Sequence, residues 1–507
     1  SPLLAAHSGD INLNPELFAR VKAVYDNRAA MSMLPEDAVL LEETYKGFEH
    51  AGALLTPDQR EQVKAINTRL SELTTEFGQK LTEATKDNAL VVADPAALEG
   101  YSESQLAAAR AAAADRGVAG YVVPLLNTTQ QPSLPDLDVR GTRQALFDNS
   151  IHRTDRGGPN DTRLNLAEQA RLRAQKAALF GDADWASYQL YDNMAKDPAT
   201  ALGFMQRLVP ALAATQRREA AVLNARIAED GHDFTVQPWD WDYYAEIVRR
   251  EQYDLDESAV KPYFEVQRVL EDGVFYAANR LYGLTFAKRD DLPVYHPTVS
   301  VYTVMDRDGS ELGLFYFDPF QRDNKQGGAW MSNYVDQSEL FGTKPVIYNV
   351  LNIAPPAEGE PALATFDNVT TMFHEFGHAL HGLFADQRYP SLSGTAVARD
   401  FVEYPSQVNE MWATDPAVLR NYAKHWQTGA TIPNELIEKI EAASKFNQGY
   451  ALGETVTAAL LDMKWHSLSA AEAAAIDTPE EVNAFEAQAL AELGLETELV
   501  PPRYRSS

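Results

Sequence analysis

The chain has 507 residues, which is long enough to bury a large core and to form more than one lobe. Its 44 basic and 73 acidic residues give a net charge of −29, which argues against nucleic acid as a partner because phosphates require a basic surface. The chain has no cysteine, so disulfides and thiolate metal sites are excluded and any metal must be bound by His and carboxylate groups. No apolar run approaches the ~20 residues of a membrane-spanning helix, so we expect no membrane partner.

The N-terminal half carries mainly helical patterns. Thr56-Pro57-Asp58-Gln59 has the form of a helix start, with an N-cap Thr and Pro at the first helical position. Apolar residues then recur every three or four positions as far as Leu81, which predicts a long amphipathic helix. Residues 90–92 and 121–123 are predicted strands on either side of an Ala-rich helix near residues 105–114.

Residues 261–284 predict a further helix, after which the periodicity becomes that of strands. Asp308-Gly309 is a turn signal, and residues 312–317 predict the strand that follows it. Residues 329–335 and 346–350 would complete a small sheet. An edge strand of such a sheet could hold an extended peptide by main-chain hydrogen bonds, and the alternative is that the sheet only contributes packing.

The clearest chemical signal is the pair His374 and His378 with Glu375 between them, in a stretch whose apolar residues recur at helical spacing. Imidazoles four residues apart lie about 6 Å apart along a helix axis and on one face. Both can therefore reach one zinc ion at Zn–N distances near ~2.0–2.1 Å. Glu375 lies at the edge of that face, where its carboxylate can take a proton from a water held by the metal. We predict zinc rather than satisfied core histidines, because burying so many imidazoles without a partner would be costly.

Two residues of this helix predict its surroundings. Asp367 is the expected N-cap. Gly377 lies in mid-helix, where glycine costs roughly 1 kcal/mol relative to alanine. We therefore expect a second helix to pack closely against it.

A catalytic zinc takes three protein ligands and leaves one position open. His381 would lie about 10 Å along the helix axis from His374, which is too far for the two to share one ion comfortably. A carboxylate of the next predicted helix is a better candidate for the third ligand. Spacing alone does not choose among Glu403, Asp400 and Glu410.

Side chains around the ligands can be predicted as well. Gln407 follows Glu403 by one helical turn and could hydrogen-bond the outer nitrogen of a ligand His. The alternative is an ordinary polar helix residue, since Pro405 disturbs the local geometry. His381 is a second candidate for such a supporting role.

The chain carries His-Glu-Phe-Gly-His at residues 374–378, Ser-Gly-Thr at 393–395 and Asp-Phe-Val-Glu-Tyr-Pro-Ser-Gln at 400–407. In this order the motifs resemble those of the thimet oligopeptidase family of zinc peptidases, and of its bacterial peptidyl-dipeptidase branch in particular. The resemblance extends over nearly the whole chain. It implies that Glu403 is the third zinc ligand and that Glu375 is the base.

The resemblance also implies a mainly α fold, in which a two-lobed helical ellipsoid encloses a deep central channel that admits only short peptides. A small β-sheet would lie next to the zinc helix. Residues 1–255 would form a discontinuous helical lobe, residues 256–440 the catalytic lobe, and residues 441–507 helices that return to the first lobe. Gly328 and Ala329 are candidates for binding substrate.

One departure concerns the end of the chain. In the family, the sequence continues beyond Pro501–Ser507 into a segment with a His and several Tyr, which line the channel and stabilise the oxyanion. We expect this segment to be disordered, deleted, or supplied as a separate C-terminal fragment that completes the fold. Its true absence should lower catalysis by something like 10²–10³.

We predict hydrolysis of short peptides with release of C-terminal dipeptides. Arg322 and Lys325 are candidates for binding the free carboxylate of the substrate, and the alternative for each is a solvated charged turn. The alternative functions are an oligopeptidase that cleaves internal bonds, or a zinc-containing protein that binds peptides without turnover. We expect a monomer in the cytoplasm, with the periplasm as the alternative compartment.

Overall fold

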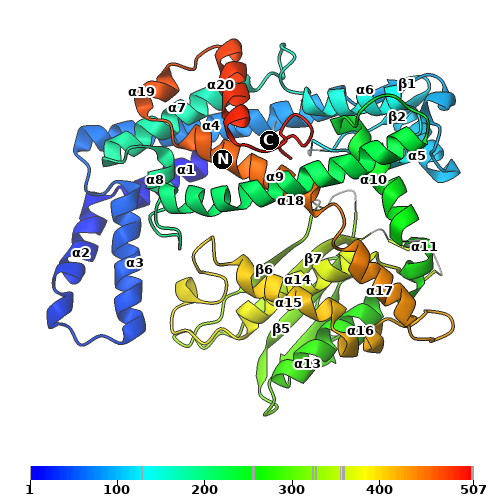
Figure 1. The fold of residues 1–507 in the computed structure, drawn as a ribbon. Coiled ribbons are helices and arrows are strands. Elements are labelled where there is room, and N and C mark those ends of the chain that lie inside the picture. The colour runs from blue at the N-terminus through cyan, green and yellow to red at the C-terminus, as the bar shows by residue number, and fades with distance from the viewer. Residues whose placement is uncertain are drawn as a thin grey trace. The chain divides into compact units, whose positions relative to one another are not determined.

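Helices make up most of the chain, together with a small sheet and a two-stranded ribbon (Figure 1). The structure is a computed structural model, and it describes residues 2–126, 129–253, 257–322, 325, 328–353, 355–356 and 360–503. The mainly α class predicted from the sequence is therefore confirmed. Among the described residues, no helix is both long and apolar enough to span a bilayer.

The chain divides into two units. Unit 1 comprises residues 1–23, 45–252 and 445–507, and unit 2 comprises residues 24–44 and 253–444. The helices up to residue 253 are α1 (Pro2–Asn12), α2 (Pro15–Asp26), α3 (Pro35–Ala51), α4 (Pro57–Asp87), α5 (Glu103–Asp115), α6 (Arg140–Ile151), α7 (Arg163–Phe180), α8 (Trp185–Gln189), α9 (Pro198–Glu229) and α10 (Pro238–Tyr253). Those that follow are α11 (Glu257–Val260), α12 (Val266–Arg268), α13 (Tyr276–Tyr282), α14 (Phe366–Leu383), α15 (Glu403–Thr414), α16 (Pro416–Tyr422), α17 (Asn434–Ala443), α18 (Gln448–His466), α19 (Ala470–Ala474) and α20 (Pro479–Glu492).

Local sequence signals account for much of unit 1. Thr56 caps α4, because its hydroxyl accepts the backbone N–H of Gln59 while the Gln59 side chain accepts the backbone N–H of Thr56. The predicted strands are β1 (Leu90–Val92) and β2 (Tyr121–Val123), which pair antiparallel. The predicted Ala-rich helix between them is α5.

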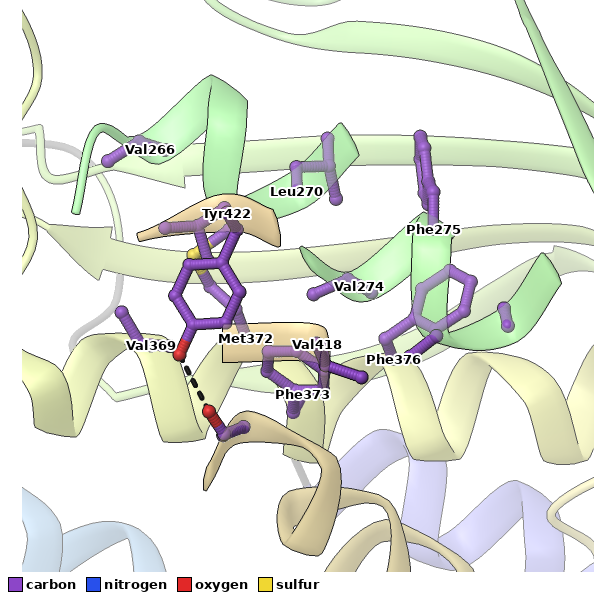
Figure 2. Close-up of a cluster of buried hydrophobic side chains, with 14 of the residues drawn as sticks. Val266, Leu270, Val274, Phe275, Val369, Met372, Phe373, Phe376, Val418 and Tyr422 are labelled. Carbon is purple, nitrogen blue, oxygen red and sulfur yellow. Dashed lines mark hydrogen bonds between the residues drawn. The ribbon is translucent and has the colours of Figure 1, made fainter. Parts of the chain in front are cut away.

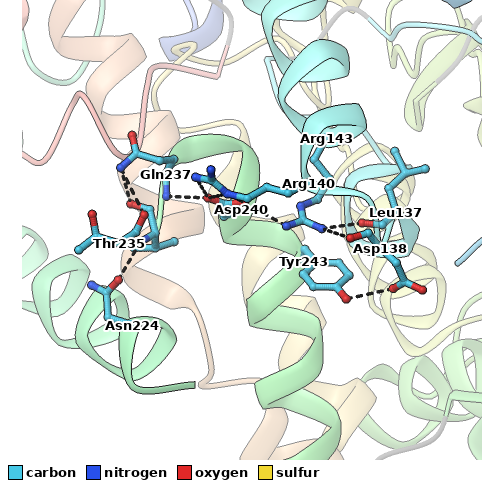
Figure 3. A network of polar contacts seen from close by, with 10 residues as sticks. Leu137, Asp138, Arg140, Arg143, Asn224, Thr235, Gln237, Asp240 and Tyr243 are labelled. Atoms are coloured by element: carbon cyan, nitrogen blue, oxygen red, sulfur yellow. Dashed lines mark hydrogen bonds and ion pairs between the residues drawn. The ribbon is translucent and has the colours of Figure 1, made fainter. Parts of the chain in front are cut away.

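A buried charge network joins α6 to α10 in unit 1 (Figure 3). Asp240 is fully buried and accepts hydrogen bonds from Arg140 at 2.8 Å and from Arg143 at 3.1 Å. Arg143 is also buried and donates to the carbonyl of Leu137 at 2.7 Å. Because each buried charge has a partner, the network fixes the relative position of the two helices.

The sheet of unit 2 has the strand order β3-β4-β5-β7-β6, in which β5 and β7 are parallel and the other neighbours are antiparallel. Its strands are β3 (Thr285–Lys288), β4 (Ser300–Met305), β5 (Glu311–Phe320), β6 (Trp330–Val335) and β7 (Val346–Ile353). Strand β3 was not predicted from the sequence, because its four residues are too few to show a clear alternation of apolar and polar side chains. Within the described part of the chain, β3 and β6 form the two edges of this sheet.

The helix predicted over residues 261–284 is present over residues 266–282, but its middle is not α-helical. A π-helical segment, η5 (Val269–Phe275), separates α12 from α13. A Cβ atom on Gly273 would lie 3.0 Å from the ring of Tyr422, so α16 packs directly onto the backbone of η5. An inserted residue of this kind leaves the apolar spacing nearly helical, which is why the periodicity does not reveal it.

The core of unit 2 fixes α14 between the sheet and two helical segments. Phe373 and Phe376 of α14 are buried with Phe315 of β5 and Ile347 of β7. Figure 2 shows both phenylalanine rings among side chains of η5 and α16. With its apolar side held in this way, α14 presents its histidines in a fixed direction.

Candidate metal centre

The start of α14 is set by Thr365. Its hydroxyl accepts the backbone N–H of Asn368 at 3.1 Å, and the Asn368 side chain accepts the backbone N–H of Thr365 at 3.3 Å. The prediction that Asp367 is the N-cap is wrong, because Asp367 lies in the first turn. Its negative charge is favourable there, next to the positive end of the helix dipole.

The expected second helix is α15, and it packs against Gly377. A Cβ atom at this position would lie 2.6 Å from Cα of Ser406 and 2.9 Å from the carbonyl oxygen of Pro405. Asn409 of α15 donates a hydrogen bond of 2.7 Å to the carbonyl of Phe373. Only glycine permits this close approach, which brings the first turn of α15 over the histidines of α14.

Three of the predicted ligand side chains lie together at this crossing. The rings of His374 and His378 are 5.0 Å apart and nearly perpendicular. The Nε2 atom of each ring lies 3.1 Å from Oε2 of Glu403, and ligand atoms of the three residues all lie within 4.8 Å of one another. Two donors of a tetrahedral zinc ion at Zn–N distances of about 2.0–2.1 Å lie roughly 3.3 Å apart, so the spacing suits one ion.

Neighbouring groups orient these side chains. The hydroxyl of Ser406 lies 2.9 Å from Oε2 of Glu403 and fixes its carboxylate. Oε1 of Glu410 lies 2.7 Å from Nδ1 of His374, on the side of the ring away from Glu403. A carboxylate at Nδ1 holds the ring proton there and leaves Nε2 as the free acceptor. Burial lowers the pKa of His378, which favours the neutral imidazole that metals require.

Glu375 is buried at the edge of the same site. Its side chain is 5% exposed, and its Oε2 atom has no hydrogen-bond partner among the described residues. Burial raises its pKa to about 7, with the charge of Glu403 adding to the increase and that of His374 opposing it. A bound divalent cation would favour the ionised form, which is the form that accepts a proton.

The other candidates around the ligands lie elsewhere. Gln407 is exposed, and the contact predicted for it is made by Glu410. His381 lies one turn beyond His378, and its Nδ1 atom is buried without a hydrogen-bond partner in the part of the chain that the structure describes. Neither His381 nor Asp400 belongs to the group of three ligand atoms.

The candidate substrate residues lie at one end of the sheet. Gly328 has a positive φ of 91° and accepts a hydrogen bond from Asn352 at 2.6 Å, and Ala329 leads into β6. Arg322 and Lys325 both bind the buried carboxylate of Asp318, Arg322 through two hydrogen bonds of 2.7 Å and Lys325 at 3.1 Å. Gly327, which precedes these residues in the sequence, lies outside the described residues.

Asp318 follows Phe317, whose ring packs in the core cluster with α14. Successive side chains of a strand point to opposite faces, so Asp318 and its two cations lie on the face of the sheet away from α14. The structure therefore does not bring Arg322 and Lys325 to the histidines.

Two imidazoles from successive helical turns and a carboxylate from the next helix form a group that could hold a metal ion, with a buried glutamate beside it, in the pattern of a His-Glu-x-x-His motif. From the sequence, Glu410 was considered only as a possible third ligand. Its contact with Nδ1 of His374 was not predicted. Its spacing of two helical turns from Glu403 was the available signal, since it places both carboxylates on the same side of α15.

Comparison with known proteins agrees with this class of site. The family model described as peptidase family M3 matches residues 133–505. The dipeptidyl carboxypeptidase of Escherichia coli (strain K12) is 48% identical over 505 residues, which cover 99% of this chain and 73% of that protein. The dipeptidyl carboxypeptidase of Salmonella typhimurium is 46% identical, with 99% and 74% covered. Oligopeptidase A of Escherichia coli is 32% identical over 475 residues, with 92% and 70% covered. The chain belongs to peptidase family M3, which confirms the resemblance of its motifs.

Proposed function

We propose that this protein is a zinc-dependent peptidase that releases dipeptides from the C-terminus of short peptides. The observation that carries the proposal is the convergence of His374, His378 and Glu403 next to the buried Glu375. The 48% identity to a dipeptidyl carboxypeptidase supports the choice of reaction.

The donor set suits zinc. Two neutral imidazoles and one carboxylate are a common set of three protein ligands for this ion, and they leave one position open. The side chain of Glu403 is 54% exposed, so the group is accessible from solvent. Zinc would supply a water whose pKa falls toward ~7 and a positive charge for the oxygen of the scissile carbonyl.

The chain's own residues would move the protons. Glu375 would take the proton of the attacking water and later deliver it to the departing amine. Its buried carboxylate has a free oxygen for this purpose. Glu410 and Ser406 would hold the ligand side chains in place while this occurs.

The substrate would be a short peptide in an extended conformation. Its backbone would pair with the edge strand β6 near Gly328 and Ala329. Arg322 and Lys325 pair with Asp318 on the face of the sheet away from α14, so we do not propose them as the groups that bind the free carboxylate of the substrate.

A matched pair of short peptides, one with a free and one with an amidated C-terminus, tests the proposed selection. We expect dipeptide release from the free peptide only, with loss on chelation and recovery on addition of zinc. Glu375→Gln should lower kcat by about 10²–10⁴ while zinc content stays unchanged. Equal cleavage of both peptides would instead identify an oligopeptidase, a possibility that the 32% identity to oligopeptidase A keeps open. Zinc binding with unchanged turnover in Glu375→Gln would contradict the proposed chemistry.

A further inference from the structure

Unit 1 contains a cavity that the proposed peptidase reaction does not use. It has a volume of about 350 Å³ and lies among side chains of α4, α7 and α18. Its apolar wall is formed by Phe77, Leu166 and Trp465, with the small side chain of Ala170 beside them. A pocket with an apolar wall and a few converging polar groups is the usual form of a small-molecule site.

The polar side of the cavity is centred on Arg173. Its guanidinium donates to Oε1 of Gln169 at 3.3 Å and lies 3.0 Å from Nε2 of His466. Because arginine only donates, Nε2 must accept, and the proton of the His466 ring is then on Nδ1. That nitrogen lies 3.1 Å from the carboxylate of Asp462.

Arg173 is therefore a partly buried cation whose two direct contacts are to acceptor atoms without a negative charge, Oε1 of Gln169 and Nε2 of His466. Asp462 contacts the other nitrogen of the His466 ring, and its side chain is 63% exposed, so solvent screens the favourable effect of its charge on Arg173. Burial lowers the pKa of Arg173, which reflects the cost of holding a cation there. Buried charges in proteins are normally paired, and the open cavity beside this guanidinium leaves room for an anion.

We propose that this cavity binds a small organic carboxylate with an apolar body. A planar carboxylate fits the planar fork of one guanidinium, and the apolar body would lie against Phe77, Leu166 and Trp465. A phosphate dianion fits less well, because His466 turns an accepting nitrogen toward Arg173 and Asp462 adds negative charge, and the described lining residues include no second lysine or arginine. This site is independent of the proposed peptidase function.

Titration of the full chain with 3-phenylpropionate and with its neutral amide, by isothermal calorimetry or NMR, tests the proposal. We expect saturable binding of the acid, and binding of the amide weaker by at least about tenfold, because a charge-assisted hydrogen bond is lost. Arg173→Gln should weaken binding of the acid by a similar factor. Arg207→Gln, which removes an equal charge from an exposed position on α9, should leave it unchanged.

Ala170→Leu is a second variant that keeps every charge and fills part of the cavity. It should also weaken the acid, and it keeps the proposal testable if Arg173→Gln does not fold. The proposal is overturned if the acid shows no saturable binding, if acid and amide bind equally, or if Ala170→Leu binds the acid like the unaltered chain. The last result would mean that the acid binds elsewhere on the chain, for example where the proposed peptidase binds the free carboxylate of its substrate.

Discussion

At the scale of single residues, His374 is held at both nitrogens of its ring. Nε2 faces Glu403 at 3.1 Å, and Nδ1 faces Glu410 at 2.7 Å. We predict that Glu410→Gln weakens zinc binding by about 10–100-fold, because the carboxylate fixes the ring proton and raises the basicity of Nε2. Competition with a chromophoric chelator would measure the affinity. Gln407→Ala, on the exposed side of the same helix, is the matched control and should bind zinc normally. Equal affinities in the two variants would contradict the role of Glu410.

The sequence predicted the candidate ligands and the candidate base better than the residues around them. His374, His378 and Glu375 follow from helical spacing alone, because four residues place two side chains on one face. Glu403 needed the family resemblance, since spacing left Asp400 and Glu410 open. The contact of Glu410 with His374 depends on how α15 crosses α14, and a sequence pattern contains no crossing angle. For this reason the sequence predicted Gln407 as the group that contacts a ligand histidine, whereas the structure places Glu410 there.

At the scale of elements, Gly377 sets the distance between α14 and α15. We predict that Gly377→Ala weakens zinc binding and lowers stability, although alanine is the better helix former by ~1 kcal/mol. The added methyl group would meet the backbone of Ser406 and Pro405 at under 3 Å, so α15 must move and carry Glu403 with it. Zinc affinity and the thermal midpoint of the metal-free protein would measure the two effects.

Gly78 provides the control for this substitution. It lies within α4, and a Cβ atom there would meet nothing within 4 Å. Gly78→Ala should therefore raise stability by roughly 0.5–1 kcal/mol and leave zinc binding unchanged. A stabilising effect of Gly377→Ala like that of Gly78→Ala would show that the close approach of α15 is not needed.

The elements that could be predicted are those whose signal is local. The capping box at Thr56 and the strands at residues 90–92 and 121–123 depend only on neighbouring residues. The π-helical segment around Gly273 depends instead on the ring of Tyr422, which lies far away in the sequence. Its position could not be predicted, because tertiary packing overrides the local preference there.

At the scale of the whole molecule, the buried charges of unit 1 determine how stability responds to substitution. Asp240 is fully buried with the buried Arg143 and with Arg140. We predict that Asp240→Asn lowers the free energy of unfolding by roughly 3–5 kcal/mol, since it leaves a buried guanidinium without its counter-charge. Asp230→Asn, which breaks the pair with Arg226 at the surface, should cost no more than about 1 kcal/mol. Denaturant midpoints would compare the two, and similar losses would contradict the argument.

Glu454 of α18 should make the free energy of unfolding depend on pH. It is buried, and its Oε1 atom has no hydrogen-bond partner among the described residues. Burial raises its pKa to about 8, with Asp242 adding to the increase and Arg503 opposing it. An unfolded glutamate titrates near 4.3, so between roughly pH 4.5 and pH 8 the folded chain binds more protons than the unfolded chain. The contribution of Glu454 to stability is therefore full at the acid end of this window and is lost as the pH rises. Urea unfolding of the metal-free protein across the window should show a decrease that is smaller in Glu454→Gln, because the amide remains neutral, while Glu375, whose pKa is also raised by burial, contributes to the rest. Glu61→Gln, at a side chain that is 74% exposed, should keep the slope of the unaltered chain, and an unchanged slope in Glu454→Gln would show that the buried acid is not its source.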